Sequence, residues 1–386
     1  MNEKLIFSTI KETFEELATG LESGTFGKKT RVGLTVLGSE HGIDELIKAG
    51  ELAAKNYKDI EVVLIGAKSE SKTCKVIEAT DEKAAHSVMD KMLLDGSLDA
   101  AVTMHYNFPI GVATVGKVIT PATGSEMYVA TTTGTSATDR VIAMIKNAIY
   151  AIATAKAGGI KNPTIGILNI EGARQVERAL NKLKTAGYEI NFVESARSDG
   201  GVFMRGNDLL MGVPDVMVTD SLTGNVLMKL FSAYSTGGNY ESLGYGYGPG
   251  CGEKYDRIIN IISRASGAPV IAGAIRFAAD SAQGNLLKAV NSEFKMARAA
   301  GLAEIFSAIE ASTVTIQTEI IKAPPEKPVT ADIPGIEIMQ LEDAVQLLWK
   351  NGIFAASGMG CTGPIVMIAP EDKEIARNIL KQAEYI

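Results

Sequence analysis

The sequence predicts an α/β protein of two lobes, each a three-layer α/β/α arrangement with a mostly parallel sheet. Its 386 residues exceed the length at which one hydrophobic core keeps growing. It is 46% hydrophobic, only 6% aromatic and holds 39 glycines, which is typical of aliphatic strands joined to helices by Gly-rich turns. Short β-branched runs also alternate with longer helical patterns, as in successive βαβ units.

The first lobe is expected to begin with a helix. Thr9 and Glu12 form a capping-box pattern, and the helix they start ends near Gly24. Strands are then predicted at residues 32–37, 61–65 and 99–104. Helices are predicted at residues 43–56, 83–94 and from 139 to the Gly158-Gly159 pair, which ends residues 1–159 as the first lobe.

The second lobe is predicted to span residues 160–339. Strands are expected near residues 164, 189 and 215, and helices at residues 173–186, at 224–232 and from 284 onward. The Pro-rich stretch 322–328 reads as an extended connector. A helix at 341–349 follows, and residues 340–386 are expected to rejoin the first lobe. The Gly/Tyr-rich run 237–252 is predicted to be a loop that is either a lid or a docking site.

Charge and composition exclude several classes of protein. The formal charge of −7 comes from 45 acidic and 38 basic residues, without a Lys/Arg block for successive phosphates of a nucleic acid. The most apolar predicted helix, residues 141–154, is too short to span a bilayer, and residues 1–7 do not read as a leader. We therefore expect a cytoplasmic protein that binds neither nucleic acid nor membrane.

The cysteines and histidines do not predict a metal site. Cys74, Cys251 and Cys361 lie far apart and form no CxxC pair. The histidines are also few and scattered, namely His41, His86 and His105. We expect no metal and no organic cofactor.

The stretch from Asp215 to Lys229 carries the first candidate site. It reads as a buried strand, a polar turn and a helix start, which would direct Ser221, Thr223 and the N–H groups around Gly224 into a crevice where anions bind. Asn225 and Lys229 share one helix face, so Lys229 could add a positive charge. An N-capped helix with a solvent-facing lysine explains the same pattern.

This stretch resembles the signature of the acyl-carrier-protein-dependent phosphate acyltransferases, Asp-Gly-Phe-Thr-Gly-Asn-Val-Ala-Leu-Lys. Further segments resemble that family in order along the chain: Gly38-Ser39-Glu40-His41-Gly42, and Ile167-Leu168-Asn169-Ile170-Glu171. The resemblance implies a phosphate acyltransferase or isopropylmalate dehydrogenase-like fold. It also implies transfer of an acyl group from a carrier thioester to inorganic phosphate, with Asn169 at the site.

Several positions depart from that family. Ser221-Leu222 stand where Gly-Phe is usual, Glu40 replaces an aspartate and Glu171 replaces a glycine. His105-Tyr106-Asn107-Phe108-Pro109 occupies the place of a Ser-Ala-Gly-Asn-Thr-Gly segment. A changed site suggests a changed acyl donor.

The second candidate site is Ser357-Gly358-Met359-Gly360-Cys361-Thr362-Gly363-Pro364. A loop of small residues lets backbone N–H groups approach an anion, which would lower the pKa of the Cys361 thiol and stabilise a tetrahedral oxyanion. Taken alone, the spacing around Cys361 favours a small buried residue at a loop-to-strand junction.

The Cys361 segment, the Tyr240–Gly252 loop and the His105–Gly111 segment together resemble the small (alpha) subunits of component C of the glycine reductase complexes, which also serve sarcosine and betaine reductase. The resemblance implies two partners, a large (beta) subunit of component C and a selenoprotein carrying carboxymethyl-selenocysteine, in a homo- or hetero-oligomer. It implies that Cys361 holds an acetyl thioester that phosphate attacks to give acetyl phosphate.

The expected phosphate-binding set combines both sites: Ser221, Thr223, Gly224, Asn225, Lys229, Asn169, His41, His105, Asn107, Gly360, Thr362 and Gly363. Phosphate needs positioning more than deprotonation, so hydroxyls, helix N-termini and a lysine suffice. His41 and His105 fit turn capping as well as substrate contact, and Cys251 is a rival nucleophile that reads more simply as an exposed loop thiol. We expect Cys361 of the first lobe to face residues 221–225 of the second across a cleft.

Three functions stay open on these grounds. The favoured one is acetyl transfer through Cys361 within glycine reductase. The alternatives are a free-standing phosphate acyltransferase that uses acyl carrier protein or coenzyme A thioesters directly, and a noncatalytic scaffold subunit. A nicotinamide dehydrogenase is disfavoured because no Gly-x-Gly-x-x-Gly follows the first strand.

Overall fold

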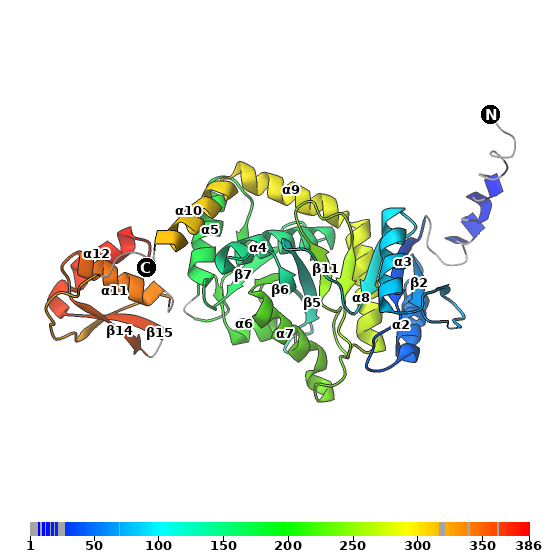
Figure 1. Cartoon of the computed structure of the whole chain (residues 1–386), viewed down its shortest axis with the longest axis horizontal. Coiled ribbons are helices and arrows are strands. Elements are labelled where there is room, and N and C mark those ends of the chain that lie inside the picture. Colours follow the sequence, from blue (N-terminus) through cyan, green and yellow to red (C-terminus); the bar gives the residue numbers. More distant parts are fainter. Residues whose placement is uncertain are drawn as a thin grey trace. The chain divides into compact units, whose positions relative to one another are not determined.

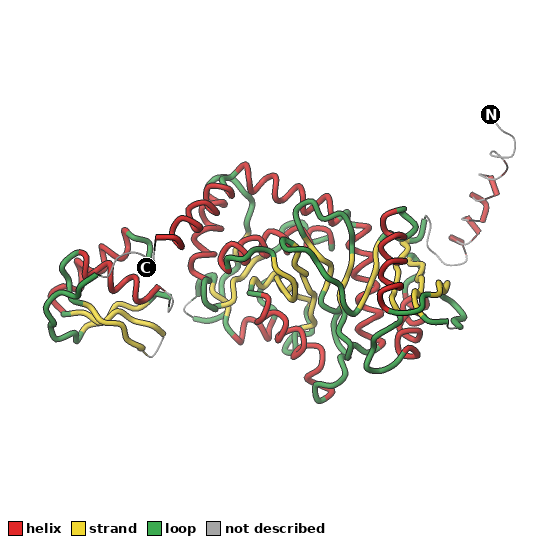
Figure 2. The backbone as a smooth tube through the Cα atoms, in the orientation of Figure 1, coloured by secondary structure: helices red, strands yellow, loops and turns green. Residues whose placement is uncertain are grey.

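The computed structural model divides the chain into two compact units (Figures 1 and 2). The first comprises Met1–Leu168 and Leu180–Leu302, and the second comprises Asn169–Ala179 and Ala303–Ile386. The structure describes residues 7, 10, 11, 13–15, 17, 18, 20, 21, 28–68, 70–198, 200–315, 321–337, 340–360 and 363–386. The units differ from the predicted lobes in two ways. Residues 160–168 and 180–302, predicted in the second lobe, belong to the first unit, and 340–386 group with 303–339 rather than with 1–159.

One 12-stranded sheet forms the centre of the first unit, and the predicted α/β class with a mostly parallel sheet is confirmed. Its strand order is β3-β2-β1-β4-β12-β11-β5-β6-β10-β7-β8, with β9 also paired to β7. Among the described strands of this sheet, only the pairs β11–β12, β11–β5 and β5–β6 are antiparallel. The bounds are Thr30–Thr35 (β1), Ile60–Gly66 (β2), Lys75–Glu78 (β3), Ala100–Thr103 (β4), Val112–Ile119 (β5), Glu126–Thr135 (β6), Thr164–Leu168 (β7), Asn191–Phe192 (β8), Phe203–Met204 (β9), Val216–Val218 (β10), Gly248–Cys251 (β11) and Ile259–Ile261 (β12).

Helices cover both faces of this sheet, which completes three layers (Figure 1). A Cβ at Gly116 of β5 would lie 2.9 Å from the Met228 sulfur of α7, whereas the Nζ of the next residue, Lys117, lies 5.2 Å from the Phe277 ring centroid of α8. Successive strand residues point to opposite faces, so α7 and α8 lie on opposite sides. The helices of the first unit are Ile43–Asn56 (α2), Glu82–Leu94 (α3), Arg140–Ala157 (α4), Gly206–Met211 (α6), Ser221–Ala233 (α7), Ala268–Gln283 (α8) and Leu286–Ala299 (α9). The boundary between the units divides Ala173–Thr185 (α5) after Ala179, and Leu302–Thr315 (α10) belongs to the second unit from Ala303 onward.

The second unit has a separate sheet and core. Strands Ala331–Pro334 (β13), Ala355–Gly360 (β14) and Gly363–Ile368 (β15) form an antiparallel sheet in the order β13-β15-β14. Helices Leu341–Lys350 (α11) and Lys373–Gln382 (α12) contact it and each other. Their apolar side chains pack together, including Leu348, Val366 and Leu380, all at 0% exposure. Residues 340–386 therefore bury their apolar surface locally, which explains their departure from the predicted first lobe.

Two predicted loops turn out to be partly strand. Ser357–Gly360 belongs to β14, because its backbone pairs with Ile365, Val366 and the residues before them in β15. Gly248–Cys251 forms β11, which joins the parallel half of the sheet to β5. Small residues hide a strand from sequence reasoning, since they carry no β-branched pattern. The described residues between 7 and 21 are helical as predicted, while Thr9, Glu12 and Gly24 lie outside the described residues.

Candidate functional site

The N-terminus of α7 carries the predicted signature residues and is already capped. Asp220 Oδ1 accepts hydrogen bonds from the N–H groups of Leu222 (3.0 Å) and Thr223 (2.9 Å), and Asp220 Oδ2 accepts one from the Thr223 hydroxyl (2.7 Å). Arg140 pairs with the same carboxylate at 3.0 Å. Burial alone would raise the pKa of Asp220, but the hydrogen bonds from Thr223 and the nearby Arg140 hold that pKa below its usual value. The carboxylate of Asp220 thus occupies the position predicted for a bound anion.

The other signature residues of α7 fix the helix on the sheet. The Asn225 side-chain amide donates to the Thr132 carbonyl at 3.1 Å. Gly224 is buried, and a Cβ there would lie 1.7 Å from the Thr131 carbonyl oxygen. Only Gly therefore permits this approach. Ser221 is exposed at the helix start.

Lys229, two turns into α7, is committed to an ion pair. Its Nζ lies 2.6 Å from Glu241 Oε1 and 3.2 Å from the Ser263 hydroxyl. Glu241 is fully buried, whereas the Lys229 side chain is 40% exposed. Ser266 and Tyr247 also donate to Glu241, at 2.6 and 3.3 Å. The positive charge of Lys229 is balanced by Glu241, although the ammonium still reaches solvent.

The Gly/Tyr-rich loop before β11 is held in place at several points. The Tyr240 hydroxyl donates to Glu45 at 2.7 Å, and the Ser242 N–H donates to the Ser232 carbonyl at 2.8 Å. Farther along, the Tyr247 N–H donates to the Ile261 carbonyl at 2.8 Å. These bonds tie the loop to α2, α7 and β12, and they argue against the lid alternative.

The segment Ser263–Ala265, which follows β12, brings several predicted residues together. His41 Nε2 lies 3.2 Å from the Ala265 carbonyl oxygen, and the His41 ring packs on Tyr240 with centroids 5.0 Å apart. Lys229 reaches Ser263 on the same segment. Arg264, between them, has its one ion pair within the described part of the chain with Glu82, at 4.0 Å, and its side chain is 57% exposed. Arg264 is therefore a more available cation than Lys229.

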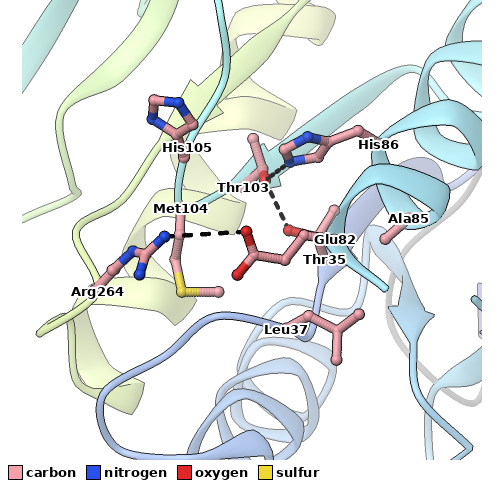
Figure 3. A pocket seen from close by; sticks show the side chains of 9 residues that line it. All are labelled: Thr35, Leu37, Glu82, Ala85, His86, Thr103, Met104, His105 and Arg264. Carbon is pink, nitrogen blue, oxygen red and sulfur yellow. Dashed lines mark hydrogen bonds and ion pairs between the residues drawn. The ribbon is translucent and has the colours of Figure 1, made fainter. Parts of the chain in front are cut away.

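A small pocket opens beside Arg264 at the carboxyl ends of β1 and β4 (Figure 3). Thr35 and Thr103, from adjacent parallel strands, share a 2.7 Å hydrogen bond, and His86 Nε2 lies 3.0 Å from the Thr103 hydroxyl. Burial lowers the pKa of His86, which favours its neutral form. Nine residues line the pocket: Thr35, Leu37, Glu82, Ala85, His86, Thr103, Met104, His105 and Arg264.

The remaining predicted residues divide between the two units. His105 borders the pocket but is exposed, and its ring points away from the other lining side chains in Figure 3. Asn107 is exposed in the coil after β4. Asn169 is exposed at the start of the second unit. Gly360 and Gly363 pair at the end of the β14–β15 hairpin, while Cys361 and Thr362 lie outside the described residues.

The other cysteines are poor nucleophiles. Cys251 was expected to lie in a loop, but it is in β11 with 2% exposure, and burial raises its pKa to about 12. Burial also raises the pKa of Cys74. Because the thiolate is the reactive form, neither residue competes with Cys361.

Sequence reasoning missed Arg264, Glu241, His86, Thr35 and Thr103. A usable signal existed for the threonines, because each lies within two residues of the end of a predicted strand, where ligands of α/β sheets bind. Within the described ranges, no group of three or more His, Cys, Asp or Glu residues is arranged to hold a metal ion. Likewise, the described helices include none with the length and apolarity needed to cross a membrane.

Comparisons with known proteins identify the relatives. Residues 30–367 match the family model described as "Fatty acid synthesis protein". The alpha subunit of glycine/sarcosine/betaine reductase complex component C from Peptoclostridium acidaminophilum is 56% identical over 375 residues, which cover 97% of each chain. The chain belongs to this family. The resemblance expected from the Cys361, Tyr240–Gly252 and His105–Gly111 segments is thereby confirmed.

More distant relatives share part of the chain. A phosphate acyltransferase of Bacillus cytotoxicus is 25% identical over 240 residues, covering 52% of this chain and 70% of that protein. Among solved structures, a branched-chain phosphotransacylase from Enterococcus faecalis V583 covers 66% of this chain and 99% of its own, with a TM-score of 0.48 and 16% identity.

Proposed function

We propose that this chain is the alpha subunit of component C of a glycine, sarcosine or betaine reductase, and that it transfers an acetyl group to inorganic phosphate. The observation that carries the proposal is the 56% identity to the Peptoclostridium acidaminophilum subunit across 97% of both chains. A large (beta) subunit of component C and a selenoprotein carrying carboxymethyl-selenocysteine are its proposed partners. Inorganic phosphate is the co-substrate, and no organic cofactor takes part.

In the proposed reaction the acetyl group is held as a thioester on Cys361. Phosphate oxygen attacks the thioester carbonyl, the new C–O bond forms, the C–S bond breaks and the thiolate leaves with its electron pair. A thiolate is a good leaving group, so the protein mainly has to position phosphate and exclude water. Sequence motifs support Cys361, since it follows Gly360 and precedes Thr362-Gly363 in a run of small residues.

The charges around α7 favour a phosphate site away from the start of this helix. Asp220 already occupies N–H groups at the start of the helix, so an anion bound by Thr223 would face a carboxylate. Around the segment after β12, by contrast, Arg264 is half-exposed, and Lys229 lies next to Ser263. We therefore place phosphate beside Arg264 and Lys229, with His41 at the border of the site.

A second candidate function is direct acyl transfer from acyl carrier protein or coenzyme A to phosphate without an enzyme thioester. The similarity to the phosphate acyltransferase of Bacillus cytotoxicus, over 52% of this chain, favours it. The two candidates differ in whether an external thiol is required. They also differ in whether Cys361 is acylated.

Isotope exchange between labelled phosphate and acetyl phosphate distinguishes them. The assay uses the full-length chain with its large subunit. Exchange without added thiol, lost in Cys361→Ser and retained in Cys251→Ser, is the expected result. Exchange that appears only after coenzyme A or acyl carrier protein is added would establish the second candidate. Absence of exchange under all conditions, with no acetylated Cys361 peptide by mass spectrometry, would leave a scaffold role.

A further inference from the structure

The pocket beside Arg264 lies where the strand order of the sheet reverses. From β1 the chain proceeds to β2 and β3 on one side, and β4 then pairs on the other side of β1. The carboxyl ends of β1 and β4 therefore flank a topological switch point, where open α/β sheets bind ligands. Thr35 ends β1 and Thr103 ends β4, so both hydroxyls belong to this crevice.

The interior of the pocket suits a very small apolar group. Leu37, Ala85 and Met104 contribute aliphatic surface, and Figure 3 shows the Met104 side chain extending between Glu82 and Leu37. The cavity volume is about 10 Å³, which is close to the minimum space that a single water-sized group requires. A methyl group is larger than a water molecule, so it enters only with a small shift of flexible lining side chains such as Met104, and a longer alkyl chain needs a larger shift.

The polar atoms of the pocket favour a neutral ligand. The Thr35 hydroxyl donates to the Thr103 hydroxyl, which also bonds to His86, and burial favours the neutral form of His86. Glu82 at the rim, 48% exposed, repels an anion that enters. Phosphate would lose its hydration in the interior without a cation to replace it. Arg264 stands at the same rim, where it can meet a carbonyl oxygen or a phosphate outside.

We propose that this pocket binds the methyl end of the acyl group and restricts the reaction to two-carbon acyl groups. This inference rests on the proposed acyl transfer, and it adds the determinant of acyl length. The side chains of Met104 and Leu37 limit the depth of the pocket, and the hydrogen bonds that connect His86, Thr103 and Thr35 fix the position of its polar wall. Binding is noncovalent, so the acyl group can arrive as any thioester or acyl phosphate.

The test compares acetyl phosphate with butyryl phosphate in the labelled-phosphate exchange assay. The assay uses the full-length chain with its large subunit, with or without added thiol, whichever of the two supports exchange. Each methylene that a pocket rejects changes the specificity by roughly 10-fold or more. Wild type should therefore prefer acetyl over butyryl phosphate by at least about tenfold. Met104→Ala, which deepens the pocket, should reduce this preference by at least tenfold. An unchanged preference would overturn the inference and leave the proposed function standing.

A matched control is available in Met89→Ala. Met89 lies in α3 with 0% exposure and does not line the pocket. Met89→Ala removes the same atoms as Met104→Ala, and this variant should keep the wild-type preference for acetyl over butyryl phosphate. An equal change of preference in both variants would show that general loosening, not pocket depth, sets acyl length, and would overturn the inference.

If wild type shows no exchange, a binding measurement tests the pocket assignment directly. The chain has three histidines, so ¹⁵N-histidine labelling gives few NMR signals, and His86→Gln identifies the His86 signal. Methyl thioacetate should shift the His86 signal, while methyl thiobutyrate and inorganic phosphate should shift it much less. A shift with thioacetate and no exchange would retain the pocket but remove the proposed function. No shift, or an equal shift with thiobutyrate, would refute the pocket assignment.

Discussion

Gly224→Ala should destabilise the protein even though alanine favours helices. A Cβ at this position would lie 1.7 Å from the Thr131 carbonyl oxygen, whereas carbon and oxygen normally approach no closer than about 3.3 Å. Helix α7 would have to move by roughly 1.6 Å, the difference between these distances. The Asn225 bond to the Thr132 carbonyl opposes that movement.

The expected loss in the free energy of unfolding combines two opposing effects. Overpacking of this severity costs about 3 kcal/mol, while replacing glycine by alanine inside a helix contributes about 1 kcal/mol of stability. The net loss is about 2 kcal/mol, which for a unit of this size lowers Tm by about 3 °C. Thermal melting followed by circular dichroism measures the shift.

A matched control separates the clash from helix propensity. Gly206, at the start of α6, has no atom within 4 Å of an added Cβ, so Gly206→Ala should melt at or slightly above the wild-type temperature. A Gly224→Ala protein that melts with wild type would refute the close packing of α7 on β6.

Three further predictions concern the charged and polar groups of the first unit. Asp220→Ala should lose the helix cap and about 1 kcal/mol of stability at pH 7. The pKa of Asp220 is lowered in the folded state, so this difference should disappear as the pH falls below about 3.9, and urea titrations at several pH values measure it. Glu241→Leu should lower the free energy of unfolding by about 3 kcal/mol, because Lys229, Ser266 and Tyr247 lose their acceptor. Glu241→Gln should lower it by less than half as much. Equal losses for the two variants in urea unfolding would contradict this charge-pair argument. The pKa of His86 is lowered in the folded state, so the unfolded chain binds more protons below about pH 6.5, and the stability of the protein should decline there. Thermal melts of His86→Gln should show a weaker decline with falling pH. If Tm of this variant and of wild type depend on pH in the same way, the burial of a neutral His86 is contradicted.

The regular βαβ half of the chain was predictable from local patterns. The prediction of residues 43–56 as a helix matches α2, and the predicted strands at 32–37, 61–65 and 99–104 correspond to β1, β2 and β4 within two residues at each end. In these elements the hydrophobic period follows the element type, so neighbouring residues carry the information. Strands β5 and β6 were not predicted. They pair antiparallel with each other, and β5 also pairs with β11 and β6 with β10. Both carry β-branched residues, Val and Ile in β5 and Thr in β6, so a local strand signal was present and was overlooked.

The candidate site was predictable only where residues lie at strand ends. His41 and His105 follow β1 and β4, so their approach to the crevice could be expected. Arg264 and Glu241 could not be expected, since their roles depend on contacts with Glu82 and Lys229 far away in sequence. The helix predicted at 224–232 corresponds to α7, which begins three residues earlier at Ser221, so Thr223 lies in the helix and not in the turn before it. The partners of Thr223 and Lys229, Asp220 and Glu241, change what that helix can bind.

The sequence by itself determined the α/β class and the family, because periodicity, composition and motifs are local properties of the chain. The tertiary structure decided which groups are charged, paired or accessible. It filled the start of α7 with the Asp220 carboxylate, buried Cys251 in β11 and joined Thr35, Thr103 and His86 into one wall. Burial and pairing arise from residues distant in sequence, and these interactions set the pKa, charge balance and ligand preference of a site.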